Sequence, residues 1–302
     1  MIRGNILITG GTGTLATAIL RQAREECWDA AFTLLGRSEL RLYQQWRRFS
    51  DLRVRTVIGD VRDADTMHAV VAGHDVVIHA AALKRIPECE QQPDECYRTN
   101  VLGSQHVAQA CRLRGVTHAI AISTDKACAA TTTYGASKLL MESLWRAAGY
   151  TAVRYGNVVA SNGSVIPLWR RQHARGEALT ITDRHMTRFW MAPRDAVALI
   201  VHAYQHPIPG GIWIPRMAAL PVVMMAQYVC PRAVWRETGV RATEKRHEDL
   251  VHASEPVRAA DDYLLLCADG TPGMRYTSDT APMLTASAFA TMLADAEALE
   301  TL

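Results

Sequence analysis

Two residues four positions apart, Tyr134 and Lys138, form a Tyr-x-x-x-Lys pair in the stretch "YGASK". On a helix this spacing places both side chains on one face. A phenol with a pKa of about 10 is a poor base at neutral pH, and a neighbouring ammonium can lower that pKa. The pair therefore predicts that Tyr134 accepts the proton of an alcohol while a nicotinamide cofactor takes the hydride. Thr124, which follows an apolar run, can hydrogen-bond the same hydroxyl.

A second acid and a second base stand beside this pair, because Asp125 and Lys126 directly follow Thr124. Once a sugar hydroxyl at C4 is oxidised to a ketone, the proton on C5 becomes acidic. Lys126 can then remove that proton, and Asp125 can protonate the C6 hydroxyl so that water leaves. From the residues alone a second interpretation stays open, in which Asp125 caps a loop and Lys126 points to solvent.

A glycine-rich loop, "ITGGTGTLA", joins the first apolar run to the first helical stretch. Glycine lets the backbone turn sharply and approach a pyrophosphate, while the N-terminus of the following helix offers free N–H groups. Ala16 takes the third glycine position, where only close packing of helix on strand is needed. The loop predicts a dinucleotide site formed by Gly10, Thr12, Gly13, Thr14 and Leu15.

The residues after the next two strands indicate which dinucleotide binds. "LLGRSELR" places Arg37, Ser38 and Arg41 where an NAD site has an acid for the ribose hydroxyl. Because arginine pairs well with a phosphate, we predict NADP rather than NAD. The alternative is that Arg37 is a loop residue that binds no ligand. Asp60 and Val61, after the third strand, are predicted to hold the adenine.

Short apolar runs alternate with amphipathic helical stretches through the first half of the chain, which predicts βαβ units. The predicted strands are residues 5–9, 32–36, 55–59, 76–80, 119–123 and 151–155. The small residues Ala80, Ala81 and Ala82 let the chain pass close under the cofactor. The fold class is therefore α/β, a Rossmann-like doubly wound parallel sheet with a smaller C-terminal substrate-binding lobe. We divide it into an NADP-binding domain at 1–156 and a mainly substrate-binding lobe at 157–302, with some later segments returning to the sheet.

Composition excludes several classes of protein. The net charge of +3 in 302 residues is too small to predict binding to nucleic acid or to a membrane surface. No apolar run reaches the length of a membrane span, and the N-terminus lacks the pattern of a leader peptide, so a cytoplasmic location is expected. Seven scattered cysteines contain no Cys-x-x-Cys pair, which predicts free thiols and no metal site.

The chain resembles the extended short-chain dehydrogenase/reductases, and within them the soluble, inverting UDP-N-acetylglucosamine 4,6-dehydratases of polysaccharide and pseudaminic acid biosynthesis. The motifs that carry the resemblance are "ITGGTGTLA", "STDK", "YGASK", "VRYGNVVASNGSVIPLW", "ITDRHMTRFWM" and "GVRATEKRHE". It implies NADP as cofactor, UDP-N-acetylglucosamine or a related UDP-hexosamine as substrate, and a homo-oligomer. The residues it implies are Lys84 and Asn100 near nicotinamide and substrate, and Asn157, Ser164, Val165, Pro167, Arg188, Arg241 and Glu244 along the UDP moiety.

The sequence departs from this family at two places, with Ala129 and Ala130 in place of Asn-Pro and "ASN" (160–162) in place of Gly-Ser-Arg. Both border the predicted sugar pocket. Three rival functions stay open: a UDP-sugar 4-epimerase, a dehydratase that releases the 5,6-ene, and a non-enzymatic NADP-binding protein.

Overall fold

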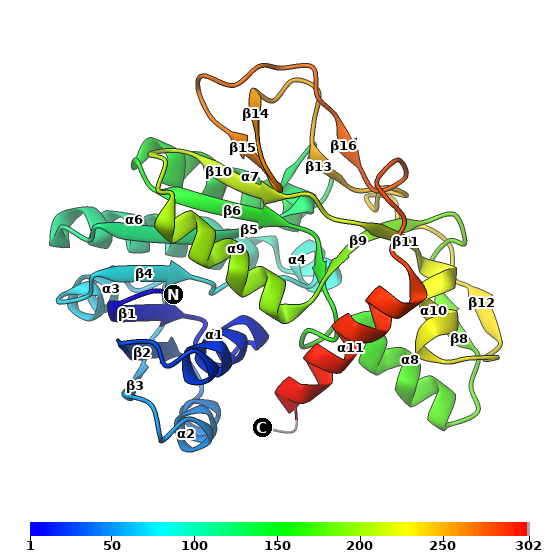
Figure 1. The fold of residues 1–302 in the computed structure, drawn as a ribbon, viewed down its shortest axis with the longest axis horizontal. Coiled ribbons are helices and arrows are strands. Elements are labelled where there is room, and N and C mark those ends of the chain that lie inside the picture. The colour runs from blue at the N-terminus through cyan, green and yellow to red at the C-terminus, as the bar shows by residue number, and fades with distance from the viewer. Residues whose placement is uncertain (301–302) are drawn as a thin grey trace.

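The computed structural model describes residues 1–300, and its centre is one large, mainly parallel sheet (Figure 1). Nine strands follow the order β14-β15-β10-β6-β5-β4-β1-β2-β3. The neighbours from β3 to β10 are parallel, while β15 runs antiparallel to both β10 and β14. The strands of this sheet are β1 (Gly4–Thr9), β2 (Ala30–Gly36), β3 (Val54–Ile58), β4 (Val76–His79), β5 (His118–Thr124), β6 (Thr151–Tyr155), β10 (Ile212–Pro215), β14 (Val257–Ala260) and β15 (Tyr263–Leu266).

Helices cover both faces of this sheet. On one face α1 packs against α9, which also contacts β5, β6 and β10; on the other, α6 packs against α3 and α7. Burial of the apolar residues between these layers forms the main core, which drives the folding. The helices of the first half are α1 (Thr14–Glu25), α2 (Glu39–Arg48), α3 (Ala64–Val71), α4 (Ile86–Gln91), α5 (Pro93–Tyr97), the π-helix η1 (Arg98–Leu102), α6 (Gly103–Arg114), the 3₁₀ turn η2 (Asp125–Ala127) and α7 (Thr133–Ala147).

The later part of the chain builds a smaller lobe with its own apolar core, centred on buried side chains such as Trp169 and Phe289. Figure 1 shows α8, α10, β8 and β12 together at the side of the large sheet. The remaining elements are β7 (Asn157–Val158), α8 (Val165–Ala174), β8 (Leu179–Ile181), β9 (Thr187–Met191), α9 (Pro193–Gln205), β11 (Ala219–Pro221), α10 (Val222–Val229), β12 (Trp235–Glu237), β13 (Asp249–Val251), β16 (Tyr276–Thr277) and α11 (Ala286–Glu300).

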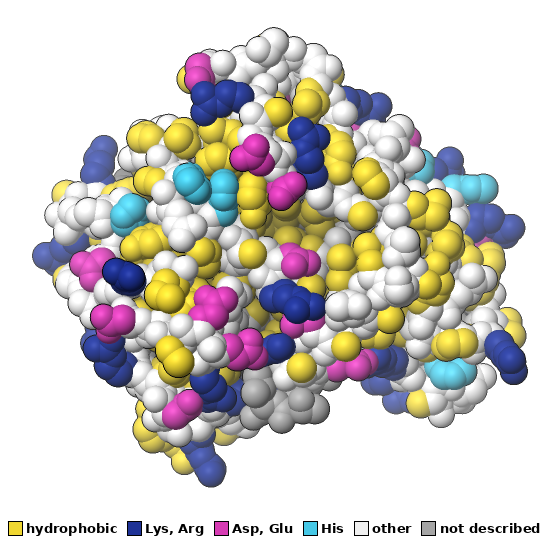
Figure 2. Space-filling model, viewed as in Figure 1, with side chains coloured by type: hydrophobic (Ala, Val, Ile, Leu, Met, Phe, Trp, Pro, Cys, Tyr) yellow, Lys and Arg dark blue, Asp and Glu magenta, His cyan; other side chains and the backbone are white. Residues whose placement is uncertain are grey.

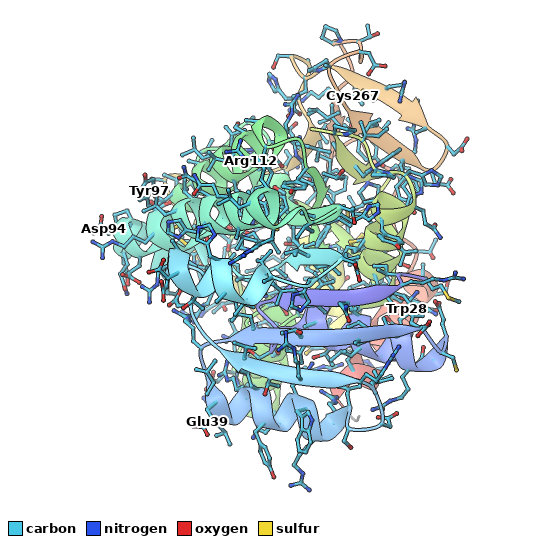
Figure 3. All side chains as sticks on the ribbon, turned by 90° about the vertical axis from the view of Figure 1, so that its left-hand side faces the viewer. Trp28, Glu39, Asp94, Tyr97, Arg112 and Cys267 are labelled. Atoms are coloured by element: carbon cyan, nitrogen blue, oxygen red, sulfur yellow. The ribbon has the colours of Figure 1, made fainter. Side chains whose placement is uncertain are left out.

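The predicted fold class is confirmed, and all six predicted strands lie in the large sheet within two residues of their expected bounds. Three strands from beyond residue 156, namely β10, β14 and β15, also join that sheet. Because its strands from β3 to β10 are parallel, their carboxyl ends share one edge, where an open α/β sheet binds its ligands. Figure 3 locates this edge: Trp28, before β2, and Glu39, after it, lie on opposite sides, and Asp94 and Tyr97 lie on the side of Glu39.

The surface drawn in Figure 2 carries Lys and Arg side chains interspersed with Asp and Glu, without a large patch of one sign. Among the described residues, no helix combines the length and apolar character needed to cross a membrane. The seven cysteines are free thiols. Within residues 1–300, no cluster of three or more His, Cys, Asp or Glu side chains is arranged to hold a metal ion.

Candidate active site

The polar triplet lies where β5 ends at the carboxyl edge of the sheet. Thr124 is the last residue of the strand, and its side chain caps the 3₁₀ turn by accepting a hydrogen bond from the Lys126 N–H at 3.4 Å. The Thr124 hydroxyl also donates to Asp125 Oδ1 at 2.9 Å. This tight turn brings two consecutive side chains together, which the alternation of an extended strand would not allow.

Asp125 and Lys126 form a close ion pair, with 2.9 Å between Nζ and Oδ1. Asp125 is fully buried, and its Oδ2 has no hydrogen-bond partner among the described residues. Burial lowers the pKa of Lys126, but the carboxylates of Asp125 and Glu248 outweigh that effect and the pKa is raised. The lysine is therefore an ammonium, and one buried carboxylate oxygen of Asp125 lies close to Gly156 without a hydrogen-bond partner among the described residues.

Tyr134 is brought to this pair by the start of α7. Thr132 caps the helix by accepting a hydrogen bond from the Gly135 N–H at 3.0 Å. A side chain at Gly135 would collide with the carbonyl oxygen of Lys126, so glycine lets the helix begin directly against the 3₁₀ turn. The phenol of Tyr134 interacts with Thr124. The structure thus brings together Thr124, Asp125, Lys126 and Tyr134.

The protonation of the Tyr-x-x-x-Lys pair differs from the sequence-based expectation. Burial raises the pKa of Tyr134, and the hydrogen bond with Thr124 only partly opposes this rise. Lys138 is not among the groups that shift this pKa, and its Nζ donates to the Met141 sulfur at 3.0 Å. Burial also lowers the pKa of Lys138 to about 8. Both shifts arise because α7 packs closely in the core, a property that four-residue spacing does not reveal.

The glycine loop forms a cradle at the start of α1. Gly10 has φ +70°, and a Cβ on it would lie 3.0 Å from the backbone of Ala80 and Ala81. No side chain caps α1 at Gly13, so the first N–H groups of the helix remain available for an anion. Thr14 Oγ1 accepts a hydrogen bond from the Asn162 N–H at 3.1 Å, which joins the loop to the smaller lobe. These features fit a dinucleotide pyrophosphate.

The residues predicted to bind the 2′-phosphate of NADP lie beside this cradle. Arg37 and Arg41 are exposed, and neither forms an ion pair with a residue that the structure describes. Ser38 caps α2 by accepting from the Arg41 N–H at 3.4 Å. Both guanidinium groups, free of ion pairs within the described residues, are therefore open to a phosphate.

The predicted adenine residues are more constrained. The Asp60 carboxylate accepts hydrogen bonds from the Arg62 guanidinium at 2.9 and 2.6 Å, and Arg62 also reaches Glu95 at 2.6 Å. Burial raises the pKa of Asp60, but the bonds from Arg62 outweigh it and the pKa is lowered. Val61 is buried against Gly103 of α6. An adenine would therefore share Asp60 with Arg62, a residue that sequence reasoning missed.

Asn100 lies in the π-helix, and both polar atoms of its side-chain amide form hydrogen bonds to Leu83 and Ser137. Its Oδ1 accepts from the Leu83 N–H at 2.8 Å, and its Nδ2 donates to the Leu83 carbonyl at 2.8 Å and to Ser137 Oγ at 2.9 Å. The side chain is fully buried, so it positions the segment that carries Lys84. Lys84 itself is exposed.

The residues predicted along a UDP moiety gather at β7 and at the start of α8. Asn157 Nδ2 donates to the Phe189 carbonyl at 3.3 Å. Ser164 occupies the N-cap position of α8 without capping it, and its Oγ is buried without a partner among the described residues. Val165 and Pro167 form the first turn. An uncapped helix N-terminus with a spare hydroxyl is a suitable place for a phosphate.

Arg188, Arg241 and Glu244 also lie together, but Arg188 is bound mainly to backbone carbonyls and Glu244 lies between the two arginines. Arg188 donates to the carbonyls of Thr187, Lys245 and Arg246 at 2.8 to 3.0 Å. Glu244 lies 3.4 Å from Arg188 and 3.1 Å from Arg241. Only Arg241 of the three is exposed, so Arg188 holds the loop 244–248 more than it offers free donors.

Glu248 is the acidic residue that sequence reasoning did not assign. It is buried, and its Oε1 lies 3.5 Å from Lys126 Nζ. The residue ends the quoted segment "GVRATEKRHE", but no local pattern connects it to the distant triplet. A small pocket opens between these groups and is lined by Ile86, Lys126, Thr131, Thr132, Glu244, Lys245 and Glu248.

The chain is similar over most of its length to several known proteins. A UDP-N-acetylglucosamine 4,6-dehydratase (inverting) from Campylobacter jejuni is 37% identical over 261 residues, covering 83% of this chain and 78% of the relative. A UDP-glucose 4-epimerase from Rickettsia massiliae is 37% identical over 283 residues, covering 88% and 83%. The X-ray structure of Pen from Bacillus thuringiensis has a TM-score of 0.89 and 28% identity, covering 96% of this chain and 97% of that one.

A family model described as polysaccharide biosynthesis protein matches residues 6–265, from the first strand of the large sheet to the last. This match spans the glycine loop, the polar triplet, Tyr134 and Glu248. On that coverage and on the identity to its relatives, the chain belongs to the polysaccharide biosynthesis protein family.

Proposed function

We propose that the protein is an NADP-dependent UDP-N-acetylglucosamine 4,6-dehydratase that inverts C5. The observation that carries the proposal is the buried Asp125–Lys126 pair, 2.9 Å apart and joined through Thr124 to Tyr134. Oxidation of an alcohol needs one base, Tyr134 supported by Lys138, together with the nicotinamide. A second acid–base pair at the same place suits an additional elimination of water from the same sugar.

The contact between Asp125 and Lys126 explains how both reach their reactive states. In the resting pair the lysine is charged and the aspartate ionised, the reverse of what elimination needs. Transfer of one proton from Nζ to Oδ1 produces a neutral amine and a carboxylic acid together, without changing the charge of the pair. The low local dielectric of a buried site favours such a neutral pair.

A nicotinamide dinucleotide bound on the glycine loop would supply the chemistry of accepting hydride from C4 and returning it to C6. The Tyr134 phenol first gives its proton to solvent, and the phenolate then takes the C4 hydroxyl proton as that carbon is oxidised. Lys126 takes the proton from C5 as the C5–H bond breaks. Asp125 gives its proton to the C6 hydroxyl, which leaves as water when the C6–O bond breaks, so the pair returns to its resting state. Return of hydride to C6 would leave an enolate, which takes a proton from solvent at C5 on the face opposite the one that lost it, and this inverts C5.

The choice of NADP follows from Arg37 and Arg41, two exposed guanidinium groups beside the cradle without a carboxylate partner in the described chain. A 2′-phosphate would meet them, whereas NAD would leave them unused. Isothermal titration with NADP⁺ and NAD⁺ tests this choice. Arg37→Ala should weaken NADP⁺ binding about tenfold or more and leave NAD⁺ binding nearly unchanged; equal affinities in the wild-type protein would contradict it.

The reaction is tested by proton NMR of UDP-N-acetylglucosamine and enzyme in deuterated water. A C6 methyl signal, deuterium at C5 and changed ring couplings are expected, with no accumulation of reduced cofactor. A product with an olefinic signal and no methyl would instead identify release of the 5,6-ene. If the enzyme eliminates no water from UDP-N-acetylglucosamine, the proposal is refuted.

A UDP-sugar 4-epimerase is the second candidate, because a relative of that name is as similar to this chain as the dehydratase is. An epimerase needs Tyr134 and hydride transfer at C4, but not the elimination chemistry of Lys126. Lys126→Ala should therefore abolish dehydration, whereas it should leave a 4-epimerase active. Retained turnover of UDP-glucose by this variant would favour the epimerase.

A further inference from the structure

Glu248 is held rigidly just before β13, between two cationic side chains. It is 3% exposed, and its Oε1 lies 3.5 Å from Lys126 Nζ and 3.9 Å from Arg188 Nε. Its backbone is fixed on both sides, since its N–H donates to Ser278 Oγ and its carbonyl accepts from the Ser278 N–H, each at 2.9 Å. Glu248 is therefore a fixed charge and not a mobile surface group.

The second carboxylate oxygen of Glu248 shows that structural pairing does not explain this residue. Its Oε2 is buried and has no hydrogen-bond partner within the described chain. An unpaired buried carboxylate oxygen costs free energy, and an apolar side chain would fill the same space at lower cost. Arg188 does not neutralise it closely, because that guanidinium is occupied by three backbone carbonyls.

Lys126 therefore lies among charged groups of both signs, which come from several elements. Asp125 contacts it from its own turn, Glu248 lies 3.5 Å away just before β13, and Arg188 of β9 is a nearby like charge that lowers its pKa. Lys245 on the facing loop is turned away, with its Nζ 2.6 Å from the Cys128 carbonyl and 4.0 Å from an Asp249 oxygen. Glu248 is therefore the second carboxylate that acts on Lys126.

We propose that Glu248 is a positioning residue that keeps the shared proton on the Asp125–Lys126 pair and stabilises the ammonium formed when Lys126 accepts the C5 proton. This inference rests on the proposed function. A fixed negative charge aimed at a site where positive charge develops lowers the barrier without reorganisation during the reaction. The same charge raises the pKa of Lys126, together with Asp125 and against the effect of burial.

Glu248→Gln tests the proposal, because it removes the charge and keeps the shape. The chain contains four lysines, Lys84, Lys126, Lys138 and Lys245, so ¹⁵N NMR of labelled lysine side chains can follow Lys126 directly. The titration midpoint of Lys126 should fall by about one pH unit, and the alkaline side of the pH–rate profile for dehydration should shift to lower pH by a similar amount. The maximal rate should drop about tenfold or more, with little change in KM.

Asp249→Asn is the matched control, since it removes the neighbouring buried carboxylate, which pairs with Arg275 and Lys245. It should leave the Lys126 midpoint in place even where it lowers stability. Glu248→Asp keeps the charge, so the titration midpoint of Lys126 should stay close to its wild-type value.

The inference is overturned if Glu248→Gln leaves the midpoint and the alkaline limb unmoved, or if Asp249→Asn moves them equally. Failure of the proposed function has a different signature, because the wild-type protein itself would then form no 6-deoxy product.

Discussion

Arg154 should be the most costly single charge to remove from this protein. It lies within β6, is 1% exposed, and joins Glu142 of the α7 helix to Glu255, which follows β13. Its guanidinium donates to Glu142 at 2.9 and 2.7 Å, to Glu255 at 2.9 and 2.8 Å, and to the Leu250 carbonyl at 3.0 Å. Arg154→Met would leave the buried Glu142 and the partly buried Glu255 without their guanidinium partner.

Breaking a buried pair in this way costs about 3–5 kcal/mol of unfolding free energy near neutral pH. The loss should also depend on pH. Burial raises the pKa of Glu255, but the bonds from Arg154 outweigh it and the pKa is lowered, so its stabilisation is present at neutral pH and lost in acid. Without Arg154, only the hydrogen bonds from the His252 N–H and the Cys128 thiol oppose the effect of burial, so the pKa of Glu255 rises and protonation can relieve part of the penalty.

Urea unfolding of wild type and Arg154→Met, near neutral pH and near pH 5, measures both effects. The difference in free energy should shrink by about 1 kcal/mol or more at the lower pH. Arg62→Met is the matched control, because Arg62 also pairs two carboxylates, Asp60 and Glu95, but is 34% exposed; about 0–1 kcal/mol is expected. Equal losses in the two variants, or a loss independent of pH, would refute the reasoning.

Three further predictions concern the loop, the catalytic helix and a strained turn. Gly10→Ala should weaken NADP⁺ binding about 100-fold in isothermal titration, because φ is +70° and the methyl would press on the backbone of Ala80; an affinity within about threefold of wild type would contradict this. Lys138→Met should abolish turnover yet raise the unfolding free energy at pH 7 by roughly 1–3 kcal/mol, because the buried ammonium has its pKa lowered to about 8. The wild type should gain stability between pH 8 and 10.5, so the advantage of this variant should shrink over that window, and an unchanged advantage would count against it. Ala129→Asn should stabilise the fold by about 0.5–1 kcal/mol in urea unfolding, since φ is +43° there and asparagine tolerates the left-handed region better than alanine; a lower stability would oppose this account.

The large sheet and the glycine loop could be predicted because their signals are local. Apolar runs bounded by glycine, and a loop between strand and helix, report their own structure within a few residues. The pairing of Glu248 with Lys126 could not be predicted in this way, since the two residues meet only when β13 returns to the 3₁₀ turn. The pKa of Tyr134 was also beyond local reasoning, because burial depends on the packing of α7.

Arg154 illustrates the same limit from the opposite side. It stands in the run "TAVRY", where an arginine in a strand is ordinarily expected to face solvent. It is instead fully enclosed, because its two partners come from a helix and a distant loop. Predicting such a residue requires knowledge of both partners in space.

The return of β10, β14 and β15 to the large sheet has a consequence for producing pieces of this protein. A fragment that stops at residue 156 would leave β6 as a bare outer strand and would remove α9 from the apolar surface it covers. An unprotected strand edge of that kind invites self-association. The dinucleotide half is therefore expected to precipitate when expressed alone, so that shortened versions are better made by trimming loops than by cutting the chain in two.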